Sequence, residues 1–357
     1  MISFILIILY ISVYLGLVAT TFYILGYHSE KKKKKQLFTD KELPTVSIVI
    51  PAYNEEKSIA KTIESITASD YPKGKLEILV VDDGSGDKTL EIAKKYESKI
   101  LKVYTKLNGG KGTALNYAIK KATGEIIFSM DADTFVAPHS VKEMTRHFKN
   151  PKVMSVTPSM LIYEPKNVLQ RIQQAEYLFG LFIRKAFSSV NAIHVTPGAF
   201  SAYRKIFFKK YGAYDEDNIT EDLEMSLRIQ YNGYSIEYSP ESPAYTIAPN
   251  KFKNLVIQRR RWYTGLMKNT WKYKSIISPK YGDLGIFVLP IAWASIFLSV
   301  FVIIYVTINS LITLKSELFF LNKINFDFVS LFSISSYSIE RTIFNFLSSP
   351  IIIFLLL

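Results

Sequence analysis

The chain of 357 residues contains no cysteine. Disulfide bonds, thiolate metal sites and a cysteine nucleophile are therefore excluded together. The sequence also lacks zinc-finger spacing and any RNA-binding signature, so no nucleic acid is expected as a partner. Acidic residues are the minority among the charges, with 31 Asp and Glu against 44 Lys and Arg, which leaves a formal net charge of +13. A basic excess of this kind favours an anionic membrane surface or a phosphorylated substrate.

Apolar segments lie at both ends of the chain. The run from Ile2 to Leu25 has no charged residue and is long enough as a helix to cross a hydrocarbon core about 30 Å thick. The run Lys31 to Lys35 follows it directly. Under the positive-inside rule this order predicts a retained anchor, with the centre of the chain in the cytoplasm. A second spanning segment is predicted from Ile286 to Leu314.

A third apolar run, from Ile343 to Leu357, is shorter than a full crossing and stops at the last residue. We therefore expect the natural chain to be longer than this sequence. Together the three runs predict a multi-pass protein of the cell membrane.

The middle of the chain alternates between short apolar runs and stretches with helical spacing. The predicted strands are Val46 to Pro51, Leu76 to Val81, Leu101 to Tyr104 and Ile126 to Met130. The predicted helices are Ser58 to Ser69, Thr89 to Tyr96, Val168 to Ala186, Leu223 to Tyr231 and Phe252 to Lys268. This alternation predicts an α/β fold with a parallel, doubly wound sheet, in which the carboxyl ends of the strands meet at the edge where ligands bind.

Two carboxylates follow the fourth predicted strand, in Asp131-Ala132-Asp133. They repel each other unless a cation lies between them. Mg²⁺ or Mn²⁺ is the natural cofactor, because carboxylate oxygens suit hard divalent ions and Mg²⁺ commonly bridges carboxylates to substrate phosphates. Asp83 follows the second predicted strand and is expected at the same edge. The alternative is a solvated acidic turn after a strand.

A glycine-rich stretch surrounds Lys111, in Asn108-Gly109-Gly110-Lys111-Gly112-Thr113. It lacks the Gly-x-x-x-x-Gly-Lys-Ser/Thr spacing of nucleoside triphosphate hydrolases, so that activity is excluded as its meaning. Glycines at the start of a helix still expose backbone N–H groups, and Lys111 adds a full charge. The stretch therefore suits a diphosphate, the alternative being a glycine turn ahead of a helix.

Two further motifs lie in the second half of the chain. In Thr220-Glu221-Asp222, Thr220 is a candidate helix N-cap, and a carboxylate facing the crevice is a candidate general base. The motif Gln258-Arg259-Arg260-Arg261-Trp262 lies in a basic amphipathic stretch. Such a stretch is typical of a membrane surface, and its side chains also provide phosphate forks and a flat face for a sugar ring.

With Val81-Asp82-Asp83-Gly84 and Asp131-Ala132-Asp133, these two motifs occur in an order that resembles the membrane-bound family 2 glycosyltransferases. That group includes the cellulose, chitin, hyaluronan and poly-N-acetylglucosamine synthases. The resemblance covers Val46 to about Pro290. It implies a GT-A fold with a mainly parallel sheet, flanking transmembrane helices and amphipathic interface helices.

The resemblance also implies a role for each matching residue. For the donor, Tyr53, Glu55 and Asp83 would hold the uridine of a UDP-sugar, Lys111 would lie near the nucleotide or its phosphates, and Asp131 and Asp133 would hold the metal on the diphosphate. Arg259 and Arg261 would steady the departing diphosphate. For the acceptor, Asp222 would be the base, and Glu221, Gln258 and Trp262 would bind the acceptor.

The resulting domain prediction divides the chain into five parts. These are an N-terminal transmembrane anchor (1–27), a basic cytoplasmic linker (28–44), a cytoplasmic glycosyltransferase domain (45–250), amphipathic interface helices (251–283) and a C-terminal transmembrane region (284–357).

Three functions remain open at this stage. The first is an inverting, processive polysaccharide synthase that uses a donor of the UDP-N-acetylglucosamine or UDP-glucose type. Three apolar segments are few for an export channel, so either further helices lie outside this sequence, or subunits of a homo-oligomer share a pore, or the product is not exported by this protein. The second is transfer of one sugar to a polyprenyl or dolichyl phosphate or to a lipid-linked glycan. The third is a non-catalytic nucleotide-sugar-binding membrane protein, which the intact base, acidic pair and Arg-Trp motif disfavour.

Overall fold

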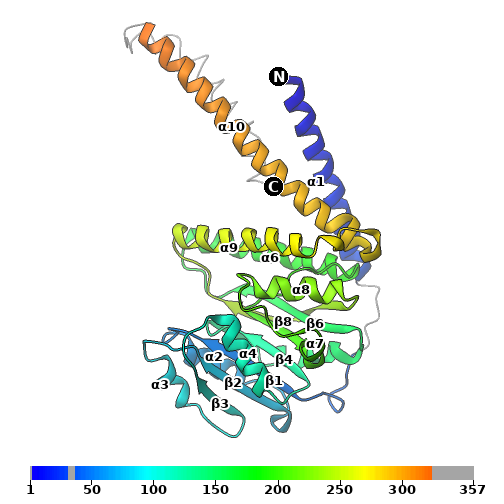
Figure 1. Ribbon diagram of the computed structural model, residues 1–357, viewed down its shortest axis with the longest axis vertical. Helices are drawn as coiled ribbons and strands as arrows, with labels where there is room; N and C mark the ends of the chain where they lie inside the picture. Colours follow the sequence, from blue (N-terminus) through cyan, green and yellow to red (C-terminus); the bar gives the residue numbers. More distant parts are fainter. Residues whose placement is uncertain (1, 31–36, 324–357) are drawn as a thin grey trace. The chain divides into compact units, whose positions relative to one another are not determined.

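The computed structural model describes residues 2–30 and 37–323 (Figure 1). The lysine run Lys31 to Lys35 and the apolar run Ile343 to Leu357, which both entered the membrane prediction, lie outside the described residues. The chain divides into two compact units. One unit comprises residues 17–289, and the other combines the two terminal segments, 1–16 and 290–357. The first unit contains every residue singled out as a candidate for the site.

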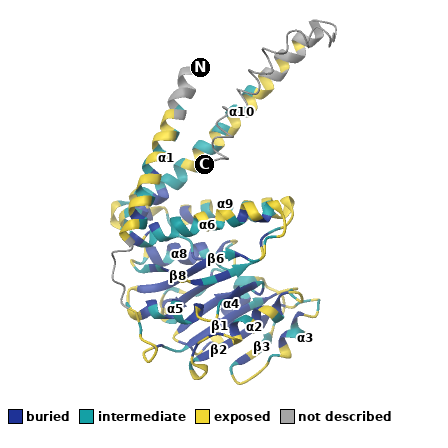
Figure 2. Cartoon of the chain, turned by 180° about the vertical axis from the view of Figure 1, so that it is seen from behind, coloured by how far each residue is buried: buried dark blue, intermediate teal, exposed yellow. Residues whose placement is uncertain are grey.

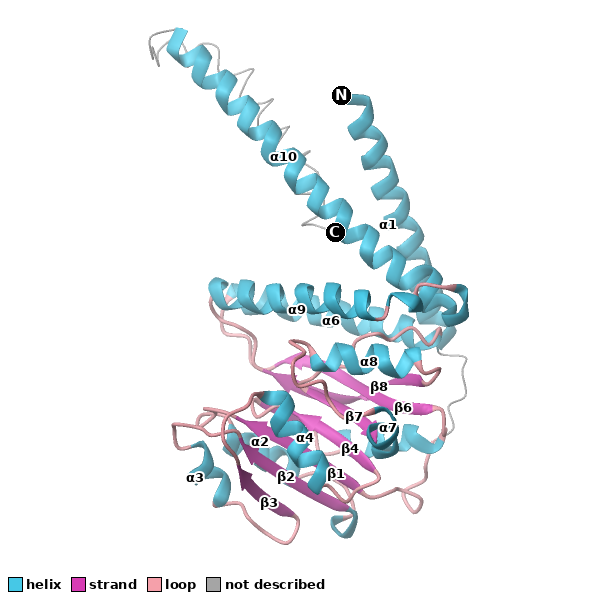
Figure 3. Ribbon diagram, in the orientation of Figure 1, coloured by secondary structure: helices cyan, strands magenta, loops and turns pink. Residues whose placement is uncertain are grey.

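Eight strands form one sheet in the order β3-β2-β1-β4-β7-β6-β8-β5 (Figure 3). The strands are β1 (Val46–Ala52), β2 (Leu76–Asp82), β3 (Leu101–Thr105), β4 (Ile126–Met130), β5 (Thr134–Val136), β6 (Val153–Ile162), β7 (Phe200–Arg204) and β8 (Ser235–Thr246). Strands β3, β2, β1 and β4 pair in parallel, as predicted. In the other half of the sheet, β6 and β8 also pair in parallel, but the prediction of parallel pairing is wrong for β7 and β5. There β7 runs antiparallel to β4 and β6, and β5 runs antiparallel to β8, so the sheet is mixed.

Each predicted helix is present and differs from the prediction mainly at its ends. The longer helices are α1 (Ile2–Glu30), α2 (Ile59–Thr67), α3 (Thr89–Lys94), α4 (Lys111–Lys121), α5 (Ser140–Arg146), α6 (Val168–Ser189), α7 (Lys205–Tyr211), α8 (Glu221–Tyr231), α9 (Phe252–Lys272) and α10 (Leu289–Lys323). Of these, α5 and α7 were not predicted. Short helical turns lie at Lys73–Lys75, His147–Lys149, Lys274–Ile276, Pro279–Tyr281 and Leu284–Val288.

The sheet is buried on both faces, which explains why its first strands are continuous apolar runs rather than alternating ones. Alternate residues of β1 point to opposite sides: Ile48 and Ile50 pack in one core, and Val49 packs in the other. Helices α2 and α5 contribute side chains to the first core, and α4, α7 and α8 contribute to the second. In Figure 2 the central strands β1, β2 and β4 are accordingly mostly dark blue.

Helices α6 and α9 form an outer layer beside α8 (Figures 1 and 2). Helix α9 keeps large apolar side chains exposed at helical spacing, namely Phe252, Val256, Tyr263, Met267 and Trp271. This pattern agrees with the amphipathic helix predicted for the segment. Helix α6 also exposes apolar residues, including Val168, Ile172 and Phe179.

Within the described residues, two segments are long and apolar enough to cross a membrane, Tyr10–Ser29 and Leu284–Ile312. Both overlap the predicted spanning segments. The first lies within α1, and the second belongs mostly to α10.

Candidate active site

The acidic pair lies at the carboxyl edge of the parallel strands, as predicted. Asp131 follows β4 directly, and its backbone N–H donates to the carbonyl of Ala199 over 2.9 Å. The carbonyl of Ala132 accepts a hydrogen bond from the Thr62 hydroxyl over 2.7 Å. These backbone contacts fix the turn, while the side chains of Asp131 and Asp133 stay only half-buried.

Lys111 joins the acidic pair to the Thr220-Glu221-Asp222 turn. Its Nζ lies 2.7 Å from Oδ1 of Asp131 and 3.0 Å from Oε1 of Glu221. Lys111 is the first residue of α4, so the glycine-rich stretch places it at the edge of the sheet. Burial alone would lower the pKa of Lys111, but the carboxylates of Asp131, Glu221 and Asp222 outweigh burial and raise it. The lysine is therefore fully charged at neutral pH.

Asp222 is held by two backbone N–H groups. Gly198 donates to Oδ2 over 2.8 Å, and Leu223 donates to Oδ1 over 2.8 Å. A Cβ built on Gly198 would lie 2.9 Å from Oδ2 of Asp222 and 3.0 Å from Nζ of Lys111. Only a residue without a side chain leaves room here. Because each carboxylate oxygen has further lone pairs, Asp222 keeps acceptor capacity for a substrate hydroxyl.

The carboxylates of the cluster titrate in different ranges. Burial, and then the charges of Asp131 and Glu55, raise the pKa of Asp133 to about 7. Burial, and then the charge of Glu221, raise the pKa of Asp222 to about 6. Burial would also raise the pKa of Glu221, but the neighbouring Lys111 lowers it below its usual value. Asp222 is thus the member of the Glu221–Asp222 pair with a pKa suited to accepting a proton near neutral pH.

Asp83 lies at the same edge but is engaged with the glycine-rich stretch. Its Oδ1 accepts from Nζ of Lys106 over 2.6 Å, and the backbone N–H groups of Gly109 and Gly110 donate to its two oxygens over 3.1 and 2.7 Å. Asp83 is almost fully buried. In this structure its hydrogen bonds fix the backbone of the glycine-rich stretch just before Lys111. Its predicted contact with uridine stays a prediction.

Tyr53 and Glu55 lie on a loop that is tied to the start of α3. The backbone N–H of Glu55 donates to Oγ1 of Thr89 over 2.7 Å. Asn54, with a φ of 54°, accepts from the backbone N–H of Gly86 through Oδ1 over 2.9 Å. The ring of Tyr53 is left 51% exposed. The loop therefore has a fixed backbone and an exposed Tyr53, and the charge of its Glu55 acts on Asp133 of the acidic pair.

The two arginines assigned to the diphosphate have different surroundings. Arg259 forms an ion pair of 2.6 Å with Glu176 of α6, and its guanidinium lies 4.3 Å from the ring centre of Trp262. Arg261 is the arginine whose charge acts on Glu221. The structure thus ties Arg259 to α6 and to the ring of Trp262, whereas Arg261 is exposed and acts on the cluster through its charge. Gln258 is half-buried on the same helix.

A divalent metal fits the donor set at the acidic pair. The described residues contain no cluster of three or more His, Cys, Asp or Glu arranged to hold a metal ion. Asp131 and Asp133 offer two carboxylates, however, and burial together with the charge of Asp131 raises the pKa of Asp133. Mg²⁺ and similar ions are often bound by one or two carboxylates, with substrate phosphates completing the shell. The site therefore suits an ion that arrives with a diphosphate.

Sequence reasoning overlooked two contributors and misjudged a third. Lys106 is one lysine among many and carries no motif. Gly198 carries no motif either, and the sequence gives no sign that its N–H reaches Asp222. Thr220 lies at the predicted N-cap position of α8, but its side chain makes no capping hydrogen bond. Instead its hydroxyl accepts from Nδ2 of Asn269 in α9 over 2.9 Å.

Residues 47–212 match the model of the family described as Glycosyl transferase family 2. The chain carries a family 2 glycosyltransferase domain. The matched residues include the acidic pair, Lys111 and the loop of Tyr53, and they end before the Thr220-Glu221-Asp222 turn. The predicted family resemblance is confirmed.

Curated relatives extend the similarity further along the chain. The poly-beta-1,6-N-acetyl-D-glucosamine synthase of Staphylococcus epidermidis is 32% identical over 237 residues, which cover 63% of this chain. The synthase of the same name from Staphylococcus aureus strain COL is 32% identical over 238 residues and covers 65% of this chain. The similarity spans 56% and 57% of the length of these two relatives.

Among solved structures, a mannosyltransferase from Pyrobaculum calidifontis in complex with GDP-Man and Mn²⁺ has the same fold. Its TM-score is 0.65 with 23% sequence identity, over 84% of this chain and 87% of that one. This likeness confirms a GT-A-like fold with a mixed sheet.

Proposed function

We propose that this chain is an inverting membrane glycosyltransferase that moves a sugar from a UDP-sugar to a hydroxyl of a growing glycan. The observation that carries the proposal is the position of Lys111, which contacts Asp131 of the acidic pair and Glu221 beside Asp222. One cation thus joins the residues proposed for the donor diphosphate to the residues proposed for the acceptor.

On the donor side, cleavage of the sugar to phosphate bond leaves negative charge on the departing UDP. Asp131 and Asp133 would hold a divalent ion on the diphosphate, where the ion neutralises phosphate charge. Lys111 and Arg261 supply fixed positive charge in the same region. Two unit charges 4 Å apart attract by about 4 kcal/mol at an effective dielectric of 20, so fixed cations here are strong enough to stabilise the leaving group.

On the acceptor side, Asp222 is the proposed base. It takes the proton of the acceptor hydroxyl as that oxygen forms a bond to the anomeric carbon, and the bond from this carbon to the diphosphate breaks. A single base suffices when the acceptor attacks from the face opposite the diphosphate, which inverts the anomeric centre. The hydrogen bonds from Gly198 and Leu223 orient the carboxylate for this step.

The similarity to poly-beta-1,6-N-acetyl-D-glucosamine synthases supports UDP-N-acetylglucosamine as the first donor to test and a polymer as the product. The two apolar segments and the exposed apolar side of α9 support a membrane location, with α9 at the lipid surface.

The direct test uses the full chain in lipid nanodiscs with Mg²⁺ or Mn²⁺ and radiolabelled UDP-sugars supplied one at a time. A ladder or high polymer from one donor supports a polysaccharide synthase and identifies the sugar. One organic-soluble labelled species that requires added polyprenyl phosphate assigns the protein to lipid-linked transfer instead. UDP binding without transfer to any acceptor would overturn the catalytic proposal.

A further inference from the structure

Helix α9 packs closely against the Thr220-Glu221-Asp222 turn at Gly265. A Cβ built on Gly265 would lie 2.0 Å from Oγ1 and 2.4 Å from Cγ2 of Thr220. Such distances lie far inside van der Waals contact, so any side chain at position 265 forces the helix and the turn apart. Glycine is among the least favourable residues inside a helix, and the missing side chain explains its presence here.

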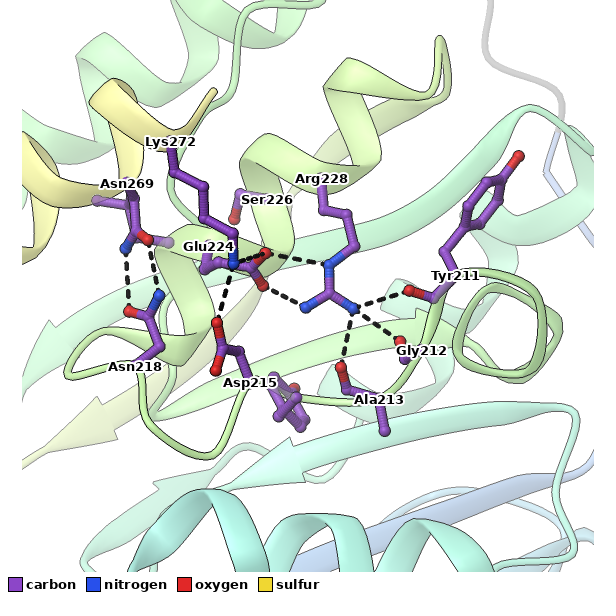
Figure 4. A network of polar contacts seen from close by, with 12 residues as sticks. Tyr211, Gly212, Ala213, Asp215, Asn218, Glu224, Ser226, Arg228, Asn269 and Lys272 are labelled. Carbon is purple, nitrogen blue, oxygen red and sulfur yellow. Dashed lines mark hydrogen bonds and ion pairs between the residues drawn. The ribbon is translucent and has the colours of Figure 1, made fainter. Parts of the chain in front are cut away.

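Asn269 strengthens the same contact one helical turn further along α9. Its Nδ2 donates to Oγ1 of Thr220 over 2.9 Å. It also exchanges two hydrogen bonds with Asn218, over 2.7 and 3.1 Å, which are visible in Figure 4. Asn269 and Thr220 are both buried. The polar contacts fix the rotation of α9 on the turn, and Gly265 fixes its distance.

The face of α9 that makes these contacts also carries Arg261. Positions 261, 265 and 269 are spaced by four residues, so they lie on one side of the helix. The charge of Arg261 acts on Glu221, the neighbour of Asp222. The contact at Gly265 therefore connects the helix that carries the leaving-group arginine with the turn that carries the base.

We propose that Gly265 is a positioning residue whose contact with Thr220 sets the separation of Asp222 and Arg261. This inference rests on the proposed function. In an inverting displacement the base and the leaving-group charge lie on opposite sides of the sugar, so their separation must match the reacting atoms. A misplacement of about 1 Å can reduce the rate on the order of 10²-fold.

The test compares Gly265→Ala with Gly180→Ala in nanodiscs. Gly180 lies in the neighbouring α6, and a Cβ built on it meets nothing within 4 Å. We expect Gly265→Ala to lower kcat about 10²-fold while the Kd for UDP changes less than about twofold, and Gly180→Ala to leave both values unchanged. Equal kcat for the two variants overturns the inference.

A second variant separates positioning from misfolding. Thr220→Gly removes the atoms that a side chain at position 265 would meet. We expect the kcat of the double variant of Gly265→Ala and Thr220→Gly to exceed the kcat of Gly265→Ala by at least about tenfold. Such a non-additive result is expected of residues in contact. Absence of recovery, or a loss of UDP binding that matches the loss of kcat, overturns the inference.

A distance measurement keeps this inference separable from the proposed function. Because the chain has no cysteine, spin labels can be placed at Lys120→Cys on α4 and Lys268→Cys on α9, both exposed positions. We expect Gly265→Ala to shift the distance between the labels and Gly180→Ala to leave it unchanged. An unchanged distance in both overturns the inference even if the wild-type chain transfers sugar. A shift in a chain that transfers no sugar supports the contact and refutes only the proposed function.

Discussion

The backbone N–H of Gly198 donates to Oδ2 of Asp222 over 2.8 Å, and this bond places the proposed base next to the acidic pair. The connection runs through the following residue, since the carbonyl of Ala199 accepts from the N–H of Asp131 over 2.9 Å. The loop of Gly198 and Ala199 therefore holds both the proposed base and the acidic pair, where β4 ends and β7 begins.

Replacement of Asp222 by Asn should abolish most transfer and preserve donor binding. A positioned general base typically contributes about 10²-fold to 10⁴-fold, and the amide cannot accept the proton. The measurement is kcat with the preferred UDP-sugar together with the Kd for UDP. Asp217→Asn, at an exposed acid in the preceding loop, is the matched control and should behave as wild type. Near wild-type transfer by Asp222→Asn would show that the base is wrongly assigned.

The pH profile should have an acid limb set by Asp222. Its pKa is raised to about 6, and a base works only when deprotonated, so kcat/KM should fall about tenfold per pH unit below about 6. Glu221→Gln removes a charge that raises this pKa, so the limb should move to lower pH. Profiles are measured at saturating Mn²⁺, with UDP binding followed over the same range. Movement of this limb to higher pH in Glu221→Gln would contradict the assignment of the limb to Asp222.

Removal of the metal should weaken donor binding through the acidic pair. We expect EDTA, or Asp133→Asn, to weaken UDP binding by at least about tenfold, because the cation that links carboxylates to diphosphate is lost. Titration calorimetry with and without Mn²⁺ measures the effect. Asp70→Asn, at an exposed acid paired with Lys142, is the control. Binding of UDP that ignores both Mn²⁺ and Asp133→Asn would exclude the metal role.

Gly198→Ala should impair catalysis through Asp222 and Lys111. The added Cβ would lie 2.9 Å from the carboxylate and 3.0 Å from the ammonium group, so both must shift. We expect a kcat loss on the order of 10²-fold. Gly180→Ala provides the control. The kcat of Gly198→Ala is informative when the Tm of this variant stays within a few degrees of the wild-type value. Full activity in Gly198→Ala would show that the base does not depend on this loop.

Glu224→Gln should destabilise the fold. Glu224 is fully buried and accepts hydrogen bonds from Arg228 and Lys272 (Figure 4). It also accepts one from the hydroxyl of Tyr273. Removing one member of a buried ion pair typically costs about 3 to 5 kcal/mol, because the partner charge is left uncompensated. Thermal unfolding in nanodiscs measures the loss. Glu91→Gln, in an exposed pair with Lys95, should change stability by less than about 1 kcal/mol. Equal Tm values would contradict the structural role of Glu224.

Local patterns predicted the parallel half of the fold because its strands are continuous apolar runs buried on both sides. Strands β5 to β8 escaped prediction. Their order depends on pairing between residues far apart in sequence, such as Met130 with Phe200, and spacing carries no information about such pairs. The same limit applies to the site. The end of a predicted strand indicated Asp131 and Asp133 as site residues. The contact of Gly198 with Asp222 and the packing of Gly265 against Thr220 depend on tertiary structure.

The division of the sheet has a consequence for how such a chain can diversify. The loops proposed for the nucleotide follow parallel strands β1, β2 and β4, whereas the residues proposed for the acceptor, Asp222, Gln258 and Trp262, lie on segments that come after β7. Changes after residue 212 can therefore remodel the acceptor side while the nucleotide loops stay intact. Lys111 contacts both sides, and so does the loop of Gly198 and Ala199. Exchange of segments between homologues would first meet incompatibility at these positions.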